Sequence, residues 1–222
     1  MWTTASRGRR TPRRSHFEPV RSNLARLNRT AALLLSLLVA SAFVATQAGA
    51  AAPPALKAGV FSPPYMAPDF SLPGSDGSDV TLARYRGKVV LLTFGFTNCA
   101  AVCPTTLSTL AQARSRLGKA AASVQVIYVT VDPERDNATR MHDYLAAFDP
   151  SFVGATGTPA ALAAVRQKYG VTAVKRGTGR DYVMAHTSSI FLIDPAGRLR
   201  ALMPFGHDAA DFVHDVKLLL VQ

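Results

Sequence analysis

Cysteine is scarce in this sequence, which has two among 222 residues, Cys99 and Cys103. So low a density excludes a small secreted scaffold held together mainly by disulfides. The sequence also lacks internal repeats and low-complexity domains. Beyond residue 50 the basic residues are scattered, with no aromatic residues interleaved and no basic helix face. A nucleic-acid-binding function is therefore rejected, although the chain is basic overall.

The positive charge is concentrated at the N-terminus. The whole chain has 25 basic and 14 acidic residues, a net charge of +11. Residues 1–29 hold eight arginines and one acid, Glu18, so the remaining 17 basic and 13 acidic residues give only +4. We expect residues 1–30 to be a basic n-region that stays on the cytoplasmic side of a membrane.

An uncharged stretch from Thr30 to Leu56 follows this basic arm. Its length suffices to span a bilayer, and Ala48-Gly49-Ala50 fits the small-x-small pattern of a cleavage site. Residues 31–52 are therefore expected to be an export signal or a retained membrane anchor. With either outcome the C-terminal part is exported to the periplasmic side of the cell envelope, anchored or released after cleavage near Ala50.

The remainder divides into an Ala/Pro-rich tether over residues 53–67 and one domain over residues 68–222. Hydrophobic periodicity and turn residues predict a hairpin, then strand, helix and strand in a parallel βαβ unit, and later an antiparallel strand pair. This order predicts an α/β fold with an N-terminal hairpin and a central mixed sheet flanked by helices. The expected strands cover 88–96, 124–131, 180–184, 188–193 and 199–204, and the expected helices 104–118, 138–148, 159–169 and 208–221.

Cys99 and Cys103 lie directly after the first of these strands, and Pro104 suggests that a helix begins near the second cysteine. A helix N-terminus favours the thiolate form, which raises both nucleophilicity and metal affinity. The pair can close a redox-active disulfide or bind one soft metal ion. A purely structural disulfide is disfavoured, because so short a loop removes little chain entropy.

His186 is the candidate third partner, since it stands between two extended segments near the cysteine turn; a structural role is the alternative. Asp132 ends the second strand, either beside the site or as a cap of the following turn. Met184 shares the strand face of His186, as an extra soft ligand or as a packing residue. Three further histidines are assigned to the surface or to packing: His142, His207 and His214.

Three blocks together resemble the Sco/SenC family. They are Cys99-Ala-Ala-Val-Cys-Pro104, Val129-Thr-Val-Asp-Pro-Glu-Arg-Asp136 and His186-Thr-Ser-Ser-Ile-Phe-Leu-Ile-Asp-Pro-Ala-Gly197. The resemblance implies a thioredoxin-like fold and a copper protein that assists assembly of the copper site of cytochrome c oxidase. It implies copper ligation by Cys99, Cys103 and His186. It also implies two partners, a copper donor chaperone and a copper-accepting protein such as an oxidase subunit.

The donor chemistry agrees with this resemblance, because two thiolates and one imidazole form a soft site suited to Cu(I). Two departures concern Ala185, where the family usually has an acid, and Ala100-Ala101, where it usually has Pro-Asp. A metallochaperone has no substrate turnover of its own. The alternatives are enzymes: a thiol–disulfide oxidoreductase with Cys99 as nucleophile and Cys103 as resolving thiol, or, with less support, a thiol peroxidase.

Overall fold

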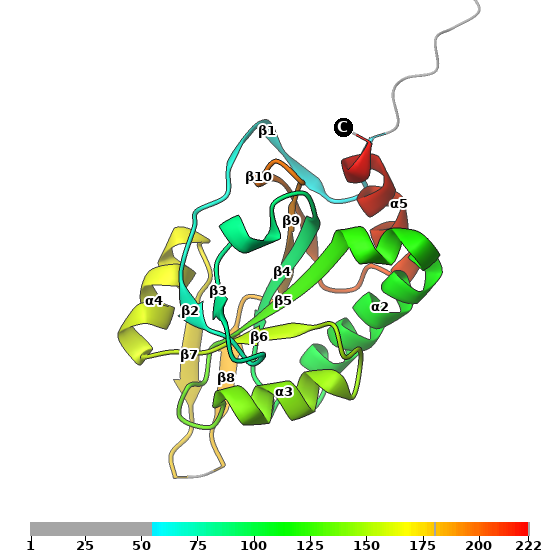
Figure 1. Cartoon of the computed structure of the whole chain (residues 1–222). Coiled ribbons are helices and arrows are strands. Elements are labelled where there is room, and N and C mark those ends of the chain that lie inside the picture. Colours follow the sequence, from blue (N-terminus) through cyan, green and yellow to red (C-terminus); the bar gives the residue numbers. More distant parts are fainter. Residues whose placement is uncertain (1–54, 180, 222) are drawn as a thin grey trace, which may run out of the picture. The chain divides into compact units, whose positions relative to one another are not determined.

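Two parallel strands form the centre of the fold (Figure 1). They are β4 (Val89–Gly95) and β5 (Val124–Thr130), joined by helix α2 (Val102–Leu117) in the predicted βαβ order. Every residue of both strands is buried, which explains why they appear as continuous apolar runs in the sequence. The computed structural model describes residues 55–179 and 181–221.

Four further strands complete a six-stranded mixed sheet with the order β1-β10-β9-β4-β5-β6. Strand β6 (Val153–Ala155) runs parallel to β5, while β9 (Ser189–Ile193) runs antiparallel to β4. Strand β10 (Arg198–Pro204) returns antiparallel to β9, and β1 (Gly59–Met66) pairs antiparallel with β10 at the edge. The predicted α/β class and mixed central sheet are thus confirmed.

Strand β1 differs from the sequence-based expectation, because residues 59–66 were predicted to belong to a tether. The prolines that suggested a tether, Pro63 and Pro64, lie in this edge strand, between the register positions Val60 and Tyr65 where the pairing shifts. An edge strand tolerates proline, since one side of its backbone has no partner strand. The folded domain therefore includes residues that precede the predicted boundary at residue 68.

Helices cover both faces of the sheet (Figure 1). Helix α5 (Ala209–Leu220) packs against α2, and α3 (Ala138–Ala146) packs on β6. On the opposite face, α4 (Pro159–Lys168) leads to Tyr169, whose ring packs against rings from β4 and β9 in tilted and edge-on contacts. The predicted N-terminal hairpin is present, and the short elements are β2 (Leu72–Pro73), β3 (Asp79–Val80), η1 (Ala83–Tyr85) and η2 (Gly118–Ser123).

A second hairpin lies outside the main sheet and carries His186. Its strands are β7 (Ala173–Arg176) and β8 (Val183–His186), and His186 is paired with Ala173 at the open end. The sequence predicted β8 approximately but not β7, whose four residues combine two apolar and two basic side chains. The hairpin brings the end of β8 close to the point where β4 ends and α2 begins.

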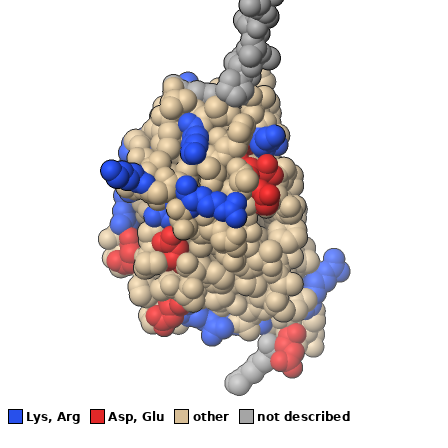
Figure 2. All heavy atoms as spheres, turned by 90° about the vertical axis from the view of Figure 1, so that its right-hand side faces the viewer, with Lys and Arg blue, Asp and Glu red and all other residues tan. Residues whose placement is uncertain are grey.

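Residues 1–54 lie outside the described part of the chain, and so do the predicted n-region and the segment 31–52. Among residues 55–179 and 181–221, no helix has the length and apolar character needed to cross a membrane. On the face shown in Figure 2, basic and acidic side chains are interspersed over a largely uncharged surface.

Candidate metal-binding and redox site

The two cysteines lie where β4 ends and α2 begins. Cys99 is in the connecting loop and half-buried, whereas Cys103 is the second residue of α2 and only 3% exposed. Both are free thiols. The backbone N–H of Cys103 donates to the Sγ atom of Cys99 over 3.4 Å, so the first sulfur lies against the N-terminus of the helix. The predicted helix start near the second cysteine is confirmed.

The two thiols differ in acidity. Burial raises the pKa of Cys99, but hydrogen bonds from the backbone of Cys103, Ala101 and Val102 outweigh it, so the net pKa is lowered. Burial raises the pKa of Cys103 to about 12, against smaller opposing contributions from Tyr128 and the Phe96 backbone. The half-buried sulfur is therefore the better thiolate and nucleophile, and the buried one is held as a thiol.

His186 contacts the buried cysteine. Its Nε2 atom lies 3.8 Å from Cys103 Sγ, and its Nδ1 atom lies 2.8 Å from the carbonyl oxygen of Thr187. A carbonyl only accepts hydrogen bonds, so Nδ1 carries the proton and Nε2 presents its lone pair toward the sulfur. Burial lowers the pKa of His186, against a smaller opposing effect of the Thr187 bond, and this favours the neutral ring.

Cys103 contacts both Cys99 and His186, so the structure brings the three predicted site residues together. Within the described residues, no three side chains of His, Cys, Asp or Glu form a ready-made metal cluster. The ring of Phe96 packs edge-on against the imidazole of His186, with centroids 5.8 Å apart. The donors are two sulfurs and an unprotonated imidazole nitrogen, which fits a soft ion and provides no oxygen ligands for Mg²⁺ or Ca²⁺.

Tyr128 is a site residue that the sequence analysis missed. It lines a small cavity of about 10 Å³ together with Cys103 and His186. Its buried hydroxyl has no hydrogen bond of normal geometry among the described residues, yet it lies close enough to Cys103 for the two groups to perturb each other's pKa. In the sequence, only the position of Tyr128 in the buried strand that pairs with the strand before the cysteines indicated this placement.

Gly95 makes room for this tyrosine. A Cβ atom at Gly95 would lie 2.1 Å from the Tyr128 hydroxyl oxygen, closer than any real contact. The last residue of β4 must therefore lack a side chain for the tyrosine to reach the cysteine site. This glycine was part of the predicted strand, but the strand pattern alone assigned it no role.

Other predicted residues lie elsewhere. Met184 lines a separate cavity of about 230 Å³ with the side chains of residues that include Asp132 and Arg166, and the cysteines are not part of its lining. Asp132 is buried and bonds to Arg135 and Tyr182.

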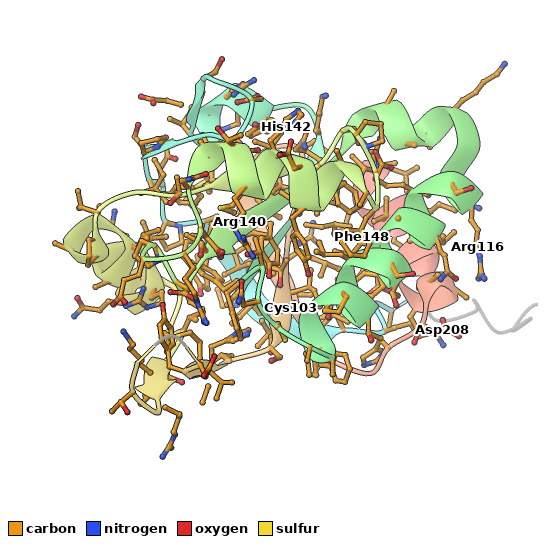
Figure 3. The ribbon with its side chains drawn as sticks, turned by 90° about the horizontal axis from the view of Figure 1, so that it is seen from below. Cys103, Arg116, Arg140, His142, Phe148 and Asp208 are labelled. Carbon is orange, nitrogen blue, oxygen red and sulfur yellow. The ribbon has the colours of Figure 1, made fainter. Side chains whose placement is uncertain are left out.

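Three other histidines in the described part of the chain each contact an aspartate on or beside their own helix: His142 with Asp143, His207 with Asp211 and His214 with Asp215. In Figure 3, His142 lies on the far side of α3 from Cys103, whereas Arg140 lies on the near side.

Comparison with known proteins identifies the family of this chain. The SCO1/SenC family model matches residues 61–220. The chain is 38% identical over 133 residues to the mitochondrial protein SCO2 homolog of Bos taurus, covering 58% of this chain and 50% of that protein. It is 35% identical over 128 residues to the mitochondrial SCO1 homolog 1 of Arabidopsis thaliana, covering 57% and 38%. The matched part thus spans half or less of these relatives' length.

Solved structures match the fold. The structure of Bradyrhizobium japonicum ScoI with copper bound is 37% identical, with a TM-score of 0.65 over 69% of this chain and 99% of that chain. The solution structure of apo Sco1 from Thermus thermophilus is 38% identical, with a TM-score of 0.68 over 74% and 97%. These matches confirm the thioredoxin-like fold expected from the sequence. The chain belongs to the SCO1/SenC family.

Proposed function

We propose that this protein binds copper through Cys99, Cys103 and His186 and passes it to a copper-accepting protein such as a cytochrome c oxidase subunit. The observation that carries the proposal is the contact between His186 Nε2 and Cys103 Sγ, with Nδ1 tied to the Thr187 carbonyl. A histidine that binds a metal usually donates its other ring N–H to such an acceptor, which fixes the ring and its tautomer.

The donor set favours Cu(I) as the cargo. Thiolate and imidazole are soft ligands, and three of them are one fewer than a closed structural zinc site requires. Related proteins of known structure from Bradyrhizobium japonicum and yeast hold copper. The half-buried Cys99 gives an incoming protein access to one of the three donors. A copper donor chaperone would load the site before transfer.

The cellular setting is proposed from the N-terminal sequence. Residues 1–30 would remain cytoplasmic, residues 31–52 would serve as export signal or membrane anchor, and the copper-binding domain would face the periplasm. Because β1 belongs to the fold, a tether would be shorter than residues 53–67. One related protein of known structure, BsSco, is a member of the Sco family of cytochrome c oxidase assembly proteins. An oxidase subunit that accepts copper would be met at the membrane surface.

X-ray absorption of the copper-loaded, reduced protein tests this proposal. We expect a first shell of two sulfur atoms and one nitrogen atom per copper. The His186→Ala variant should lose the nitrogen contribution and retain both sulfurs. A first shell made only of oxygen and nitrogen, or one unchanged by His186→Ala, would contradict the proposed ligands.

A second candidate function rests on the difference between the thiols. The lowered pKa of Cys99 suits attack on a substrate disulfide, which forms a mixed disulfide and releases one substrate thiolate. Cys103, once deprotonated, would then attack Cys99 Sγ, releasing the second substrate thiolate and leaving the Cys99–Cys103 disulfide. Such a reductase would lose activity in Cys99→Ser and retain it in His186→Ala, whereas a copper chaperone requires both residues.

A further inference from the structure

A short turn makes hydrogen bonds to both segments that carry the proposed ligands, and the proposed function does not use it. This turn, residues 132–136, follows β5 and precedes α3. An aspartate stands at each end. Asp132 is 2% exposed and Asp136 is fully buried, so both carboxylates make their contacts inside the protein.

The Asp132 end holds the hairpin that carries His186. One carboxylate oxygen accepts a hydrogen bond from the Tyr182 hydroxyl over 2.6 Å, and the other accepts from Arg135 Nε over 2.5 Å. Arg135 also donates to the backbone carbonyl of Tyr182 over 3.0 Å, and its guanidinium lies 3.7 Å from the centre of the tyrosine ring. Tyr182 immediately precedes β8, the strand that ends at His186.

The Asp136 end holds the loop that carries Cys99. Its carboxylate accepts hydrogen bonds from the backbone N–H of Thr97 over 3.0 Å and from the Thr97 hydroxyl over 2.6 Å. Arg140 reinforces the same loop by donating to the Thr97 hydroxyl over 2.7 Å and to the Asn98 side chain over 2.6 Å. Thr97 and Asn98 directly precede Cys99, so these bonds hold the backbone that positions the first sulfur.

The turn between the two aspartates is itself constrained. The backbone N–H of Asp136 donates to the carbonyl of Asp132 over 2.9 Å, and Pro133 restricts its own φ angle. The Thr130 hydroxyl donates to the Asp136 carboxylate over 2.7 Å and accepts from the backbone N–H of Asp132 over 2.9 Å. The turn thus has one anchor at each end and hydrogen bonds between the two aspartates.

We infer that residues 132–136 are a spacer that sets the separation between His186 and the Cys99 loop. Asp132, Tyr182, Asp136 and Thr97 are then positioning residues, which act on copper only through the ligands they hold. The copper-related part of this inference rests on the proposed function, whereas the positions of His186 and Cys99 do not depend on copper.

Three matched variants of the full-length chain, reduced and in detergent, test the spacer. Tyr182→Phe removes the hydroxyl that bonds to Asp132, and Thr97→Val removes the hydroxyl that bonds to Asp136. Tyr169→Phe is the control, because it removes a buried hydroxyl that bonds to the Pro68 carbonyl instead. All three changes delete one oxygen atom and keep the shape of the side chain.

Two readouts need no copper. We expect Tyr182→Phe to shift the imidazole nitrogen resonances of His186 and Thr97→Val to change the alkylation rate of Cys99 at least about threefold, with Tyr169→Phe altering neither. If both variants behave like Tyr169→Phe, the spacer is refuted. These readouts decide the inference even if the wild type binds no copper, which would refute the proposed function alone.

Cu(I) competition with a chelator gives the third readout. Tyr182→Phe should weaken Cu(I) binding by about tenfold, within the range for residues that orient a metal ligand. In the His186→Ala background the same change should have less than about a twofold effect, because its route to copper is gone. Thr97→Val should weaken binding in both backgrounds. An effect of Tyr182→Phe that persists without His186 would overturn the assignment of that end of the spacer.

Discussion

His186 and Cys103 stand 83 positions apart in the sequence, and their side chains meet with Nε2 3.8 Å from Sγ. The imidazole is oriented from behind by the Thr187 carbonyl and from the side by the ring of Phe96. One ring nitrogen is thus committed to a backbone hydrogen bond, and the other is free to act on sulfur or metal. This arrangement and the different surroundings of the two sulfurs determine how the protein responds to pH, alkylating agents and copper.

The stability of the protein should decrease as the pH falls, and part of this decrease should depend on His186. Burial lowers its pKa in the folded protein below the ordinary value of 6.5, so the unfolded chain binds the proton more readily. The stabilising contribution is complete above about pH 6.5 and is lost as the pH falls through the folded pKa. Between pH 7.5 and 5, thermal denaturation should show a larger loss for the wild type than for His186→Gln. Equal losses would contradict the neutral buried ring.

The two cysteines should differ in reactivity. The Cys103→Ser variant leaves the sulfur with a lowered pKa, and Cys99→Ser leaves the one whose pKa is about 12. At pH 8 the single thiol of Cys103→Ser should react with iodoacetamide roughly tenfold faster or more, because the thiolate is the reacting species. Mass spectrometry of timed samples measures both rates. Faster reaction of the Cys99→Ser protein would reverse the assigned roles.

Tyr128→Phe should cost little stability, since the lost hydroxyl has no hydrogen bond of normal geometry among the described residues. We expect the free energy of unfolding to stay within about 1 kcal/mol of the wild type, or to rise, because a poorly satisfied buried group is removed. The pKa of Cys103 should rise further, as the tyrosine lowers it. Urea denaturation checks the first point, and a loss above about 2 kcal/mol would contradict it. The pH dependence of alkylation in a Cys99→Ser background checks the second, and an unchanged or lowered pKa of Cys103 would contradict it.

Gly95→Ala should destabilise the fold at the site. The added methyl group would lie 2.1 Å from the Tyr128 hydroxyl oxygen, and overpacking of this kind costs roughly 1–3 kcal/mol. Gly59→Ala is the control, because the nearest atom to its added Cβ is at an ordinary distance of 3.6 Å. Urea denaturation of both variants measures the difference. Equal stability of the two would show that Tyr128 moves aside freely.

The sequence predicted the elements whose patterns are local. The apolar runs at residues 88–96 and 124–131 became β4 and β5, and Pro104 correctly indicated a helix start beside Cys103. The edge strand β1 was not predicted, because its prolines also suit a linker and its pairing with β10 joins segments far apart in the chain. Strand β7 was not predicted for another reason, because its four residues show no clear alternation of apolar and polar side chains.

For the site, the residue types were predictable and their arrangement was not. The family resemblance implied Cys99, Cys103 and His186 as ligands. Only the structure shows that the imidazole of His186 contacts Cys103. Tyr128 escaped prediction because a tyrosine in a buried strand usually serves packing. The role of Asp132 was left open between site and turn; its buried bonds to Tyr182 and Arg135 connect the turn to the site hairpin.

Cu(I) competition on the purified, reduced protein, with a colorimetric chelator as the competing ligand, measures directly whether Cys99, Cys103 and His186 form a copper site. We expect one tightly held copper per chain in the wild type. His186→Ala should weaken that affinity by at least about 100-fold, beyond the usual effect of residues that only orient a ligand. Release of wild-type copper to a weak chelator, or unchanged affinity in His186→Ala, would contradict a copper site built from Cys99, Cys103 and His186.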